Sequence, residues 1–234
     1  MLRKHRPTSR RATVRRTLAA AAVPVLFVAG CSGGGSDDKS GASPSPSASS
    51  ASPEPEPVTF TTLPDACEAL PEKTVEEVVP KTRDAGGKAL KSKDTASYSG
   101  CLWTGLDEYD YRSLSVSLRR FDSDLTLGSG DERAAEYAGE QIADVGADKA
   151  NKNVKDAPLE GVGDAATSIG YDTEVKEGDS AGDYRARRVV ARTANVVVTV
   201  DYSGTGFEDG ETPSAGAVQK GAETAAKAAV AAVK

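Results

Sequence analysis

Cys31 is the residue whose surroundings most clearly indicate a chemical reaction. It follows Val28-Ala29-Gly30, which closes a segment with a basic start and an apolar stretch over 18–29. This order is typical of a bacterial lipoprotein signal peptide, in which small residues enter a signal peptidase and the cysteine thiol is lipidated. The apolar stretch is too short to span a bilayer. We therefore expect Cys31 to carry a diacylglycerol that holds the mature protein on a membrane.

The two other cysteines, Cys67 and Cys101, form an even pair in a chain that the signal peptide predicts to be exported. Such a pair in an oxidising compartment favours a disulfide. The two residues are 34 positions apart, and closing a loop of that length stabilises a fold by roughly 3–4 kcal/mol in the chain-entropy model. The alternative is a pair of free, buried thiols.

Histidine chemistry is missing from the mature sequence. The only histidine, His5, lies in the signal peptide. Its removal argues against Ser-His-Asp and Cys-His catalysis and against zinc, copper or haem sites that depend on histidine. We predict no catalytic residue, no metal site and no cofactor.

Carboxylates are the remaining candidates for chemistry. One acidic group could hold calcium, but an EF-hand loop that starts at Asp122 would have Leu127 at its glycine position and Arg133 at its final ligand position. We favour caps of a turn and a helix for this group, which is Asp122, Asp124, Asp131 and Glu132. A second group, Asp107, Glu108 and Asp110, is interpreted as a solvated loop rather than a glycosidase pair.

Four arginines form the one basic cluster of an acidic domain: Arg185, Arg187, Arg188 and Arg192. On a strand, Arg185 and Arg187 share one face, where they could contact an anion or a carboxylate. The alternative is ion pairing with the domain's own carboxylates. Trp103 is a third candidate ligand contact, although packing against its neighbour Cys101 in the core is the simpler interpretation.

The overall charge excludes some partners. The whole chain has 29 Lys and Arg and 35 Asp and Glu; loss of the seven basic residues before Cys31 leaves 22 against 35, a net charge of −13. Nucleic acids and anionic lipid headgroups require a basic footprint, so neither is an expected partner.

The chain divides into three parts. Residues 1–30 are the predicted lipoprotein signal peptide, and the twin-arginine and general secretion routes both stay open. Residues 31–57 are the lipidated cysteine and a tether; its positions 32–57 hold nine Ser, five Pro and four Gly in 26 residues. Such a composition cannot bury a core and predicts disorder. Residues 58–234 are expected to form one globular domain.

Hydrophobic periodicity predicts the elements of that domain. Helices are expected after Asp65 and over 71–79, from Ser129 and from Pro213-Ser214, where helix-start signals occur. The 71–79 helix has an apolar stripe of Val75, Val78 and Val79, and Ser129 begins a capping box with Glu132.

Strands are expected over 97–104, 113–119 and 167–171, and in a hairpin of 184–192 and 196–202 around Ala194-Asn195. The 113–119 strand alternates strictly, with Leu114, Val116 and Leu118 inward, and Cys101 and Trp103 share one face of the 97–104 strand. Hairpin connections favour an antiparallel sheet, and packed helices make an α+β sandwich.

Short motifs of the chain resemble a family of actinobacterial cell-surface lipoproteins that is described as a domain of unknown function. The resemblance rests on Asp65-Ala66-Cys67-Glu68-Ala69-Leu70-Pro71, on Gly100-Cys101-Leu102-Trp103 and on Gly161-Val162-Gly163-Asp164-Ala165. It covers about 60–234. It implies an extracytoplasmic α+β domain with a disulfide, and it brings no catalytic residues.

Together these features predict a lipid-anchored protein on the extracellular face of the cell membrane. We interpret the domain as a non-enzymatic binding or sensing module for a cell-wall component or an envelope protein. Two alternatives are a cell-wall hydrolase or modifying enzyme that uses carboxylates and a carrier of an apolar ligand. The sequence does not identify the ligand or the oligomeric state.

Overall fold

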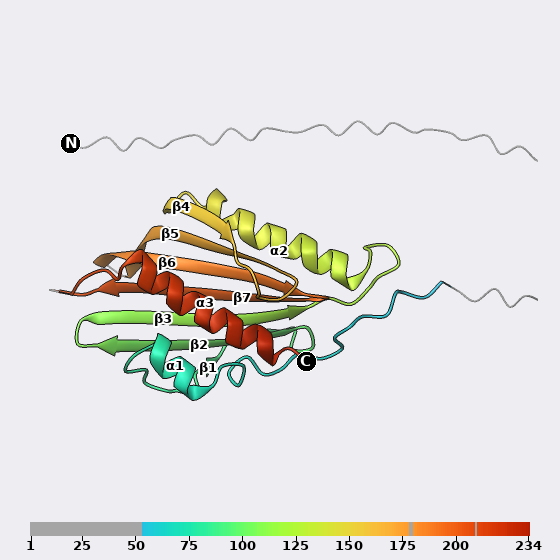
Figure 1. The fold of residues 1–234 in the computed structure, drawn as a ribbon, viewed down its shortest axis with the longest axis horizontal. Coiled ribbons are helices and arrows are strands. Elements are labelled where there is room, and N and C mark those ends of the chain that lie inside the picture. The colour runs from blue at the N-terminus through green and yellow to red at the C-terminus, as the bar shows by residue number, and fades with distance from the viewer. Residues whose placement is uncertain (1–52, 178–179, 209) are drawn as a thin grey trace, which may run out of the picture. The chain divides into compact units, whose positions relative to one another are not determined.

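The computed structural model describes residues 53–177, 180–208 and 210–234, which contain three helices and seven strands (Figure 1). The helices are α1 (Glu72–Val78), α2 (Gly130–Ala147) and α3 (Ala215–Ala232). The strands are β1 (Lys88–Ala89), β2 (Tyr98–Asp107), β3 (Asp110–Arg120), β4 (Asn151–Pro158), β5 (Ala165–Glu177), β6 (Ser180–Thr193) and β7 (Val196–Gly206).

All seven strands join one antiparallel sheet in the order β1-β2-β3-β7-β6-β5-β4. The chain makes the β2–β3 hairpin, continues through α2 to the far edge, and returns strand by strand until β7 pairs with β3. The last strand therefore lies at the centre of the sheet. The predicted α+β class with an antiparallel sheet and three helices is confirmed.

Helices cover both faces of the sheet. Alternate residues of β7 point to opposite faces: Val198 and Val200 pack toward α3, whereas Val197 packs toward α2. Figure 1 shows α3 lying across one face, with α1 beside it. The face of α3 that meets the sheet is built of small side chains, and Ala222 and Ala225 are completely buried. Alanine allows this close approach because it has only a methyl group.

Two helix predictions are corrected in detail. The residues after Asp65 form a turn rather than a helix, and the Asp65 carboxylate accepts a hydrogen bond from the Cys67 backbone amide at 2.8 Å. Pro71 is the N-cap of α1 instead of its first helical residue. The predicted Val75–Val79 stripe is buried, as is the inward face of β3. Ser129 forms the predicted capping box with Glu132 at the start of α2.

The disulfide joins Cys67 to Cys101, with the two Cα atoms 5.0 Å apart. The predicted disulfide is confirmed, and it ties β2 to the turn after Asp65, where a helix was expected. Two strands, β1 and β4, were not predicted, because β1 has only two residues and β4 is exposed and has no apolar alternation. Within the described residues no helix is both long and apolar enough to cross a membrane.

Asn195 holds three separate segments together. It sits in the β6–β7 turn, where Ala194 has a φ of 45°, and it is completely buried. Its side-chain amide donates to the carbonyls of Phe60 at 2.9 Å and Phe121 at 2.8 Å, while its oxygen accepts from the Phe60 amide at 2.9 Å. Asn195 thus holds the segment around Phe60, which precedes α1, and the residue that follows β3, Phe121.

We expect Asn195→Ala to destabilise the domain by on the order of 3 kcal/mol, because three backbone groups lose their partner and each such loss costs about 1–3 kcal/mol when buried. Denaturant unfolding measures this change. The matched control is Gln219→Ala, since the Gln219 amide donates to the Glu223 carboxylate on the exposed surface of α3. Equal unfolding midpoints for the two variants would show that the side-chain hydrogen bonds of Asn195 contribute nothing to stability.

Candidate anion-binding pocket

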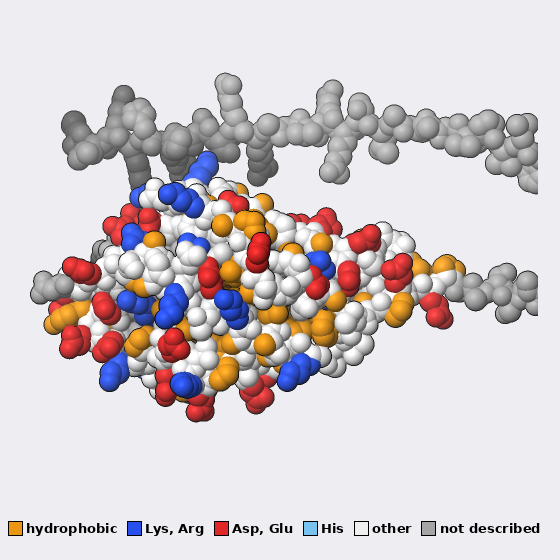
Figure 2. Space-filling view, in the orientation of Figure 1, with side chains coloured by type: hydrophobic (Ala, Val, Ile, Leu, Met, Phe, Trp, Pro, Cys, Tyr) orange, Lys and Arg blue, Asp and Glu red, His pale blue; other side chains and the backbone are white. Residues whose placement is uncertain are grey.

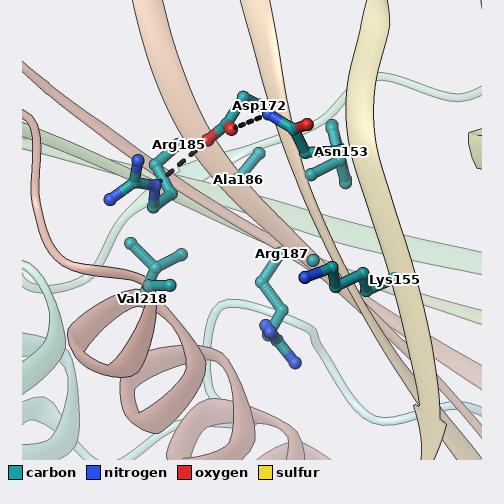
Figure 3. Close-up of a pocket in the computed structure, with 10 residues that line it drawn as sticks. Asn153, Lys155, Asp172, Arg185, Ala186, Arg187 and Val218 are labelled. Carbon is teal, nitrogen blue, oxygen red and sulfur yellow. Dashed lines mark hydrogen bonds and ion pairs between the residues drawn. The ribbon is translucent and has the colours of Figure 1, made fainter.

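A pocket of about 280 Å³ lies where the start of α3 passes over β4, β5 and β6 (Figure 3). Its wall combines basic side chains of the strands with two apolar residues of α3. The lining residues are Asn153, Lys155, Gly170, Tyr171, Asp172, Arg185, Ala186, Arg187, Ala215 and Val218. Two of the predicted ligand contacts, Arg185 and Arg187, are therefore brought together here.

A glycine lies between the two cations of the pocket wall in the sheet. Gly170 of β5 pairs with Lys155 of β4 on one side and with Arg187 of β6 on the other. Residues directly opposite one another in a sheet point to the same face. A Cβ atom at Gly170 would lie 2.6 Å from the Nη2 atom of Arg187. The missing side chain therefore lets the arginine lie across β5, and Figure 3 shows Lys155 directed toward it.

Arg187 has little charge compensation. Its Nη1 atom donates to the Ser168 hydroxyl at 2.9 Å, and among the described residues no carboxylate forms an ion pair with it. Burial lowers the pKa of Arg187, while the negative charge of Glu223 acts in the opposite direction. Lys155 likewise makes no ion pair within the described part of the chain. Two cations thus line one pocket, and within the described residues neither forms an ion pair.

Arg185 has a different role from Arg187. It donates to the Asp172 carboxylate at 3.0 Å and to the Pro213 carbonyl at 2.9 Å. The hydrogen bond from Asn153 and the contact with Arg185 hold the pKa of Asp172 below its usual value. The four residues tie β4, β5 and β6 to the start of α3, so Arg185 shapes one wall of the pocket.

The other two arginines pair with the domain's own carboxylates. Arg188 donates to Asp201 at 2.6 Å, and Arg192 lies 3.6 Å from Asp164. Both are on the opposite face of β6 from Arg187, because adjacent strand residues alternate. Ion pairing therefore accounts for Arg185, Arg188 and Arg192, and Arg187 is the member of the cluster that is left for a ligand.

Trp103 lies away from this pocket. It is 1% exposed, and its indole Nε1 donates to the Ala85 carbonyl at 3.0 Å. It belongs to the same core cluster as Cys101. Trp103 therefore packs in the core, as the simpler interpretation expected, and does not line this pocket. Cys31 lies outside the described residues.

The acidic group that was weighed as a calcium site forms turns and caps. The Asp124 carboxylate accepts from the Thr126 hydroxyl and from the amides of Thr126 and Leu127, and these bonds lower its pKa. Glu132 accepts from the Ser129 amide and hydroxyl, which likewise lowers its pKa. These two carboxylates thus accept from backbone donors in the arrangement that turns and helix starts require, whereas Asp122 pairs with Arg120.

Sequence reasoning missed Lys155, Gly170 and Asn153. Two of them lie on β4, whose polar sequence has no strand periodicity. Asn153 lies at a β-bulge, with a φ of 54° and a register shift between Lys152 and Lys155. The available signal was Gly170, because an isolated glycine inside a strand indicates that another group approaches closely.

The protein is an α+β sandwich with a pocket on one face of its sheet that is lined by basic side chains. The chain belongs to the family described as "Protein of unknown function (DUF3558)", whose model matches residues 26–225. No curated protein matches the chain.

Proposed function

We propose that the protein is a lipid-anchored envelope protein whose domain binds an anionic ligand between Lys155 and Arg187. One observation carries the proposal: Lys155 and Arg187, two cations without an ion-pair partner among the described residues, line the same pocket on either side of Gly170. A carboxylate or phosphate group in that space would receive charge-assisted hydrogen bonds, which are about twice as strong as neutral ones.

The location of the protein is inferred from its first 57 residues. The lipobox at Cys31 and the Ser/Pro-rich tether support attachment to the extracellular face of the membrane, as expected for an actinobacterial lipoprotein. A coil with the composition and length of residues 32–57 is expected to reach about 30 Å. That distance would hold the pocket above the membrane, within the cell wall.

The ligand is expected to combine one anionic group with a small apolar part. The anion faces Lys155 and Arg187, while Val218 and Ala215 form the apolar wall. Cell-wall peptides end in a carboxylate beside small side chains, and wall polymers carry phosphates. Both therefore match the pocket in charge and polarity.

Neither alternative function gains support from the structure. A carboxylate-based hydrolase needs a general acid with a raised pKa, whereas the carboxyl groups that shift in the described residues, such as Asp172, are all lowered. An apolar carrier needs space between helix and sheet, but Ala225 and Ala226 of α3 are fully buried there.

We expect Lys155→Ala with Arg187→Ala to weaken anion binding by at least about tenfold, because a hydrogen bond to a charged group contributes about 1.5–3 kcal/mol. Calorimetric titration with inorganic phosphate, and separately with a wall-derived peptide, measures the effect. Arg185→Ala is unsuitable as a probe, since it also removes the contacts to Asp172 and Pro213.

The control for this experiment removes two exposed lysines elsewhere, Lys73 of α1 and Lys149 after α2. A second variant, Gly170→Ala, keeps both charges but places a Cβ atom against the Arg187 guanidinium. Binding should fall in Gly170→Ala and persist in the lysine control. Equal losses in the control and in the Lys155/Arg187 variant would leave only a general charge effect and refute the proposal.

A further inference from the structure

A second pocket, of about 600 Å³, lies at the edge of the sheet where β2 begins. In Figure 1 this edge, with β1 and β2, is opposite the edge formed by β4. The wall consists of residues 61–65 before α1, residues between 89 and 96, the start of β2, and Arg120 at the end of β3. Sites for small molecules usually have a volume in this range. We call this site the edge pocket.

Hydrogen bonds hold the walls of the edge pocket in place. The Ala66 amide donates to the Ser99 hydroxyl at 2.8 Å, and the Leu90 amide donates to the Gly100 carbonyl at 2.8 Å. These bonds tie the segment before α1 and the segment after β1 to the same strand. A ligand therefore meets a pocket that is already formed, and little ordering entropy is lost on binding.

Arg120 brings an unsatisfied hydrogen-bond donor to the edge pocket. Its side chain is only 9% exposed, and its Nη1 atom donates to the Asp122 carboxylate. Its Nε atom, in contrast, is the one buried side-chain nitrogen or oxygen in the described residues that has no hydrogen-bond partner. Buried polar groups in folded proteins nearly always have a partner, so an exception of this kind requires an explanation.

Arg188 shows which acceptor the free edge of such a guanidinium takes in this protein. It donates from Nε and Nη2 to the two carboxylate oxygens of Asp201, at 2.6 Å and 3.2 Å. In Arg120 the pairing with Asp122 uses Nη1, so the Nε atom is left for another oxygen acceptor. Because this Nε atom is buried, the acceptor reaches it when the guanidinium turns slightly toward the pocket.

Hydroxyl groups line the rest of the edge pocket. Four side chains that carry one make no hydrogen bond within the described part of the chain: Thr61, Thr62, Thr95 and Tyr98. A Cβ atom at Gly100 would lie 2.5 Å from the Tyr98 hydroxyl oxygen, so the glycine makes room for that side chain. Each hydroxyl both donates and accepts hydrogen bonds. The wall therefore matches a ligand that is itself rich in hydroxyl groups.

The charges of the edge pocket do not favour an anion. In Figure 2 charged side chains of both signs are spread over the face that carries α3, whereas only Asp65 and Arg120 are charged among the residues that line this pocket. Asp122 already pairs with Arg120, and Asp65 is exposed. The edge pocket thus offers hydrogen bonds without an excess of positive charge, in contrast to the pocket that holds Lys155 and Arg187.

We propose that the edge pocket binds a neutral sugar. One oxygen of the sugar accepts from the Nε atom of Arg120, and its other hydroxyl groups exchange hydrogen bonds with the threonines and Tyr98. The apolar face of a sugar ring can pack against Leu63 and Leu90, which line the same pocket. The inference is independent of the anion-binding pocket and of lipid attachment.

The test titrates the full-length protein, in a detergent without sugar groups, with glucose, galactose, arabinose and N-acetylglucosamine at millimolar concentrations. At least one of them should bind. Glucuronate and galacturonate should bind more weakly than glucose and galactose, because their carboxylates meet Asp65 and the acidic domain. The proposal is overturned if no neutral sugar binds, if the uronates bind more tightly, or if a tetra-alanine peptide occupies the edge pocket and the sugars do not.

The Nε–H proton of Arg120 gives a readout that a purely structural arginine would not change. In wild-type protein, bound sugar should shift the NMR signal of this proton and slow its exchange with water, because Nε gains an acceptor. Arg120→Lys identifies the signal by its loss and keeps a positive charge for Asp122. A sugar that binds while this signal stays unchanged would occupy another site and contradict the proposal.

A pair of matched variants tests the hydroxyl groups. Thr61→Val with Thr95→Val should weaken sugar binding about fivefold or more, because two neutral hydrogen bonds are lost. The control is Thr59→Val with Thr212→Val, which changes two exposed threonines outside the pocket. All four side chains are exposed, so both variants should fold like the wild type. Equal affinities of the two variants would refute the assignment of the site.

Discussion

Replacement of Cys31 by serine should abolish incorporation of labelled palmitate completely. A serine hydroxyl cannot form the thioether through which the diacylglycerol is attached, and the lipoprotein peptidase requires that lipid before it cleaves. We therefore expect the variant to keep residues 1–30, which intact-mass measurement detects directly. Two or three acyl chains are needed for durable membrane attachment, so their loss removes the whole anchoring free energy.

The neighbouring substitution Ser32→Ala is the control, because it changes the residue after the modified cysteine without removing the thiol. It should be labelled and processed like the wild type. Continued palmitate labelling of Cys31→Ser would show that lipid is attached elsewhere, and the proposed anchor would have to be abandoned.

Loss of the Cys67–Cys101 disulfide should lower the free energy of unfolding by about 2–5 kcal/mol, the usual cost in a small exported domain. Cys67→Ala is the cleaner variant, because Cys67 is only half-buried. For a domain of this size, about 2–4 °C is lost per kcal/mol, so the melting temperature should fall by on the order of 10 °C. Thermal unfolding followed by circular dichroism measures the change.

The companion variant Cys101→Ala should be destabilised further. Cys101 is completely buried beside Trp103 in the core cluster, so removal of its sulfur also leaves a small cavity. Wild-type protein treated with a reducing agent should unfold at the same temperature as Cys67→Ala. Two thiols that react with an alkylating agent before reduction would contradict a disulfide in the exported protein.

The sequence alone determined those features that depend on local pattern. The capping box at Ser129 and the alternation of β3 both form as predicted, because each depends on residues close in the chain. The disulfide was expected from the count of cysteines in a chain that its signal-peptide pattern predicts to be exported. Cys101 and Trp103 were correctly placed on one strand face by period-two alternation.

Only the tertiary structure decided which arginine faces a ligand. Arg185 and Arg187 are equivalent by sequence, since both are strand residues on one face. Their difference comes from strands distant in the sequence: β5 brings Asp172 to Arg185 and Gly170 to Arg187, and β4 adds Lys155. Strand order and register set these neighbours, and neither can be obtained from local periodicity.

The same reason explains Asn195. The sequence identified Asn195 as a turn residue, but its hydrogen bonds reach Phe60, which is 135 positions away. Local structure depends on short-range sterics and hydrogen bonds, whereas a site depends on which distant segments the sheet places side by side.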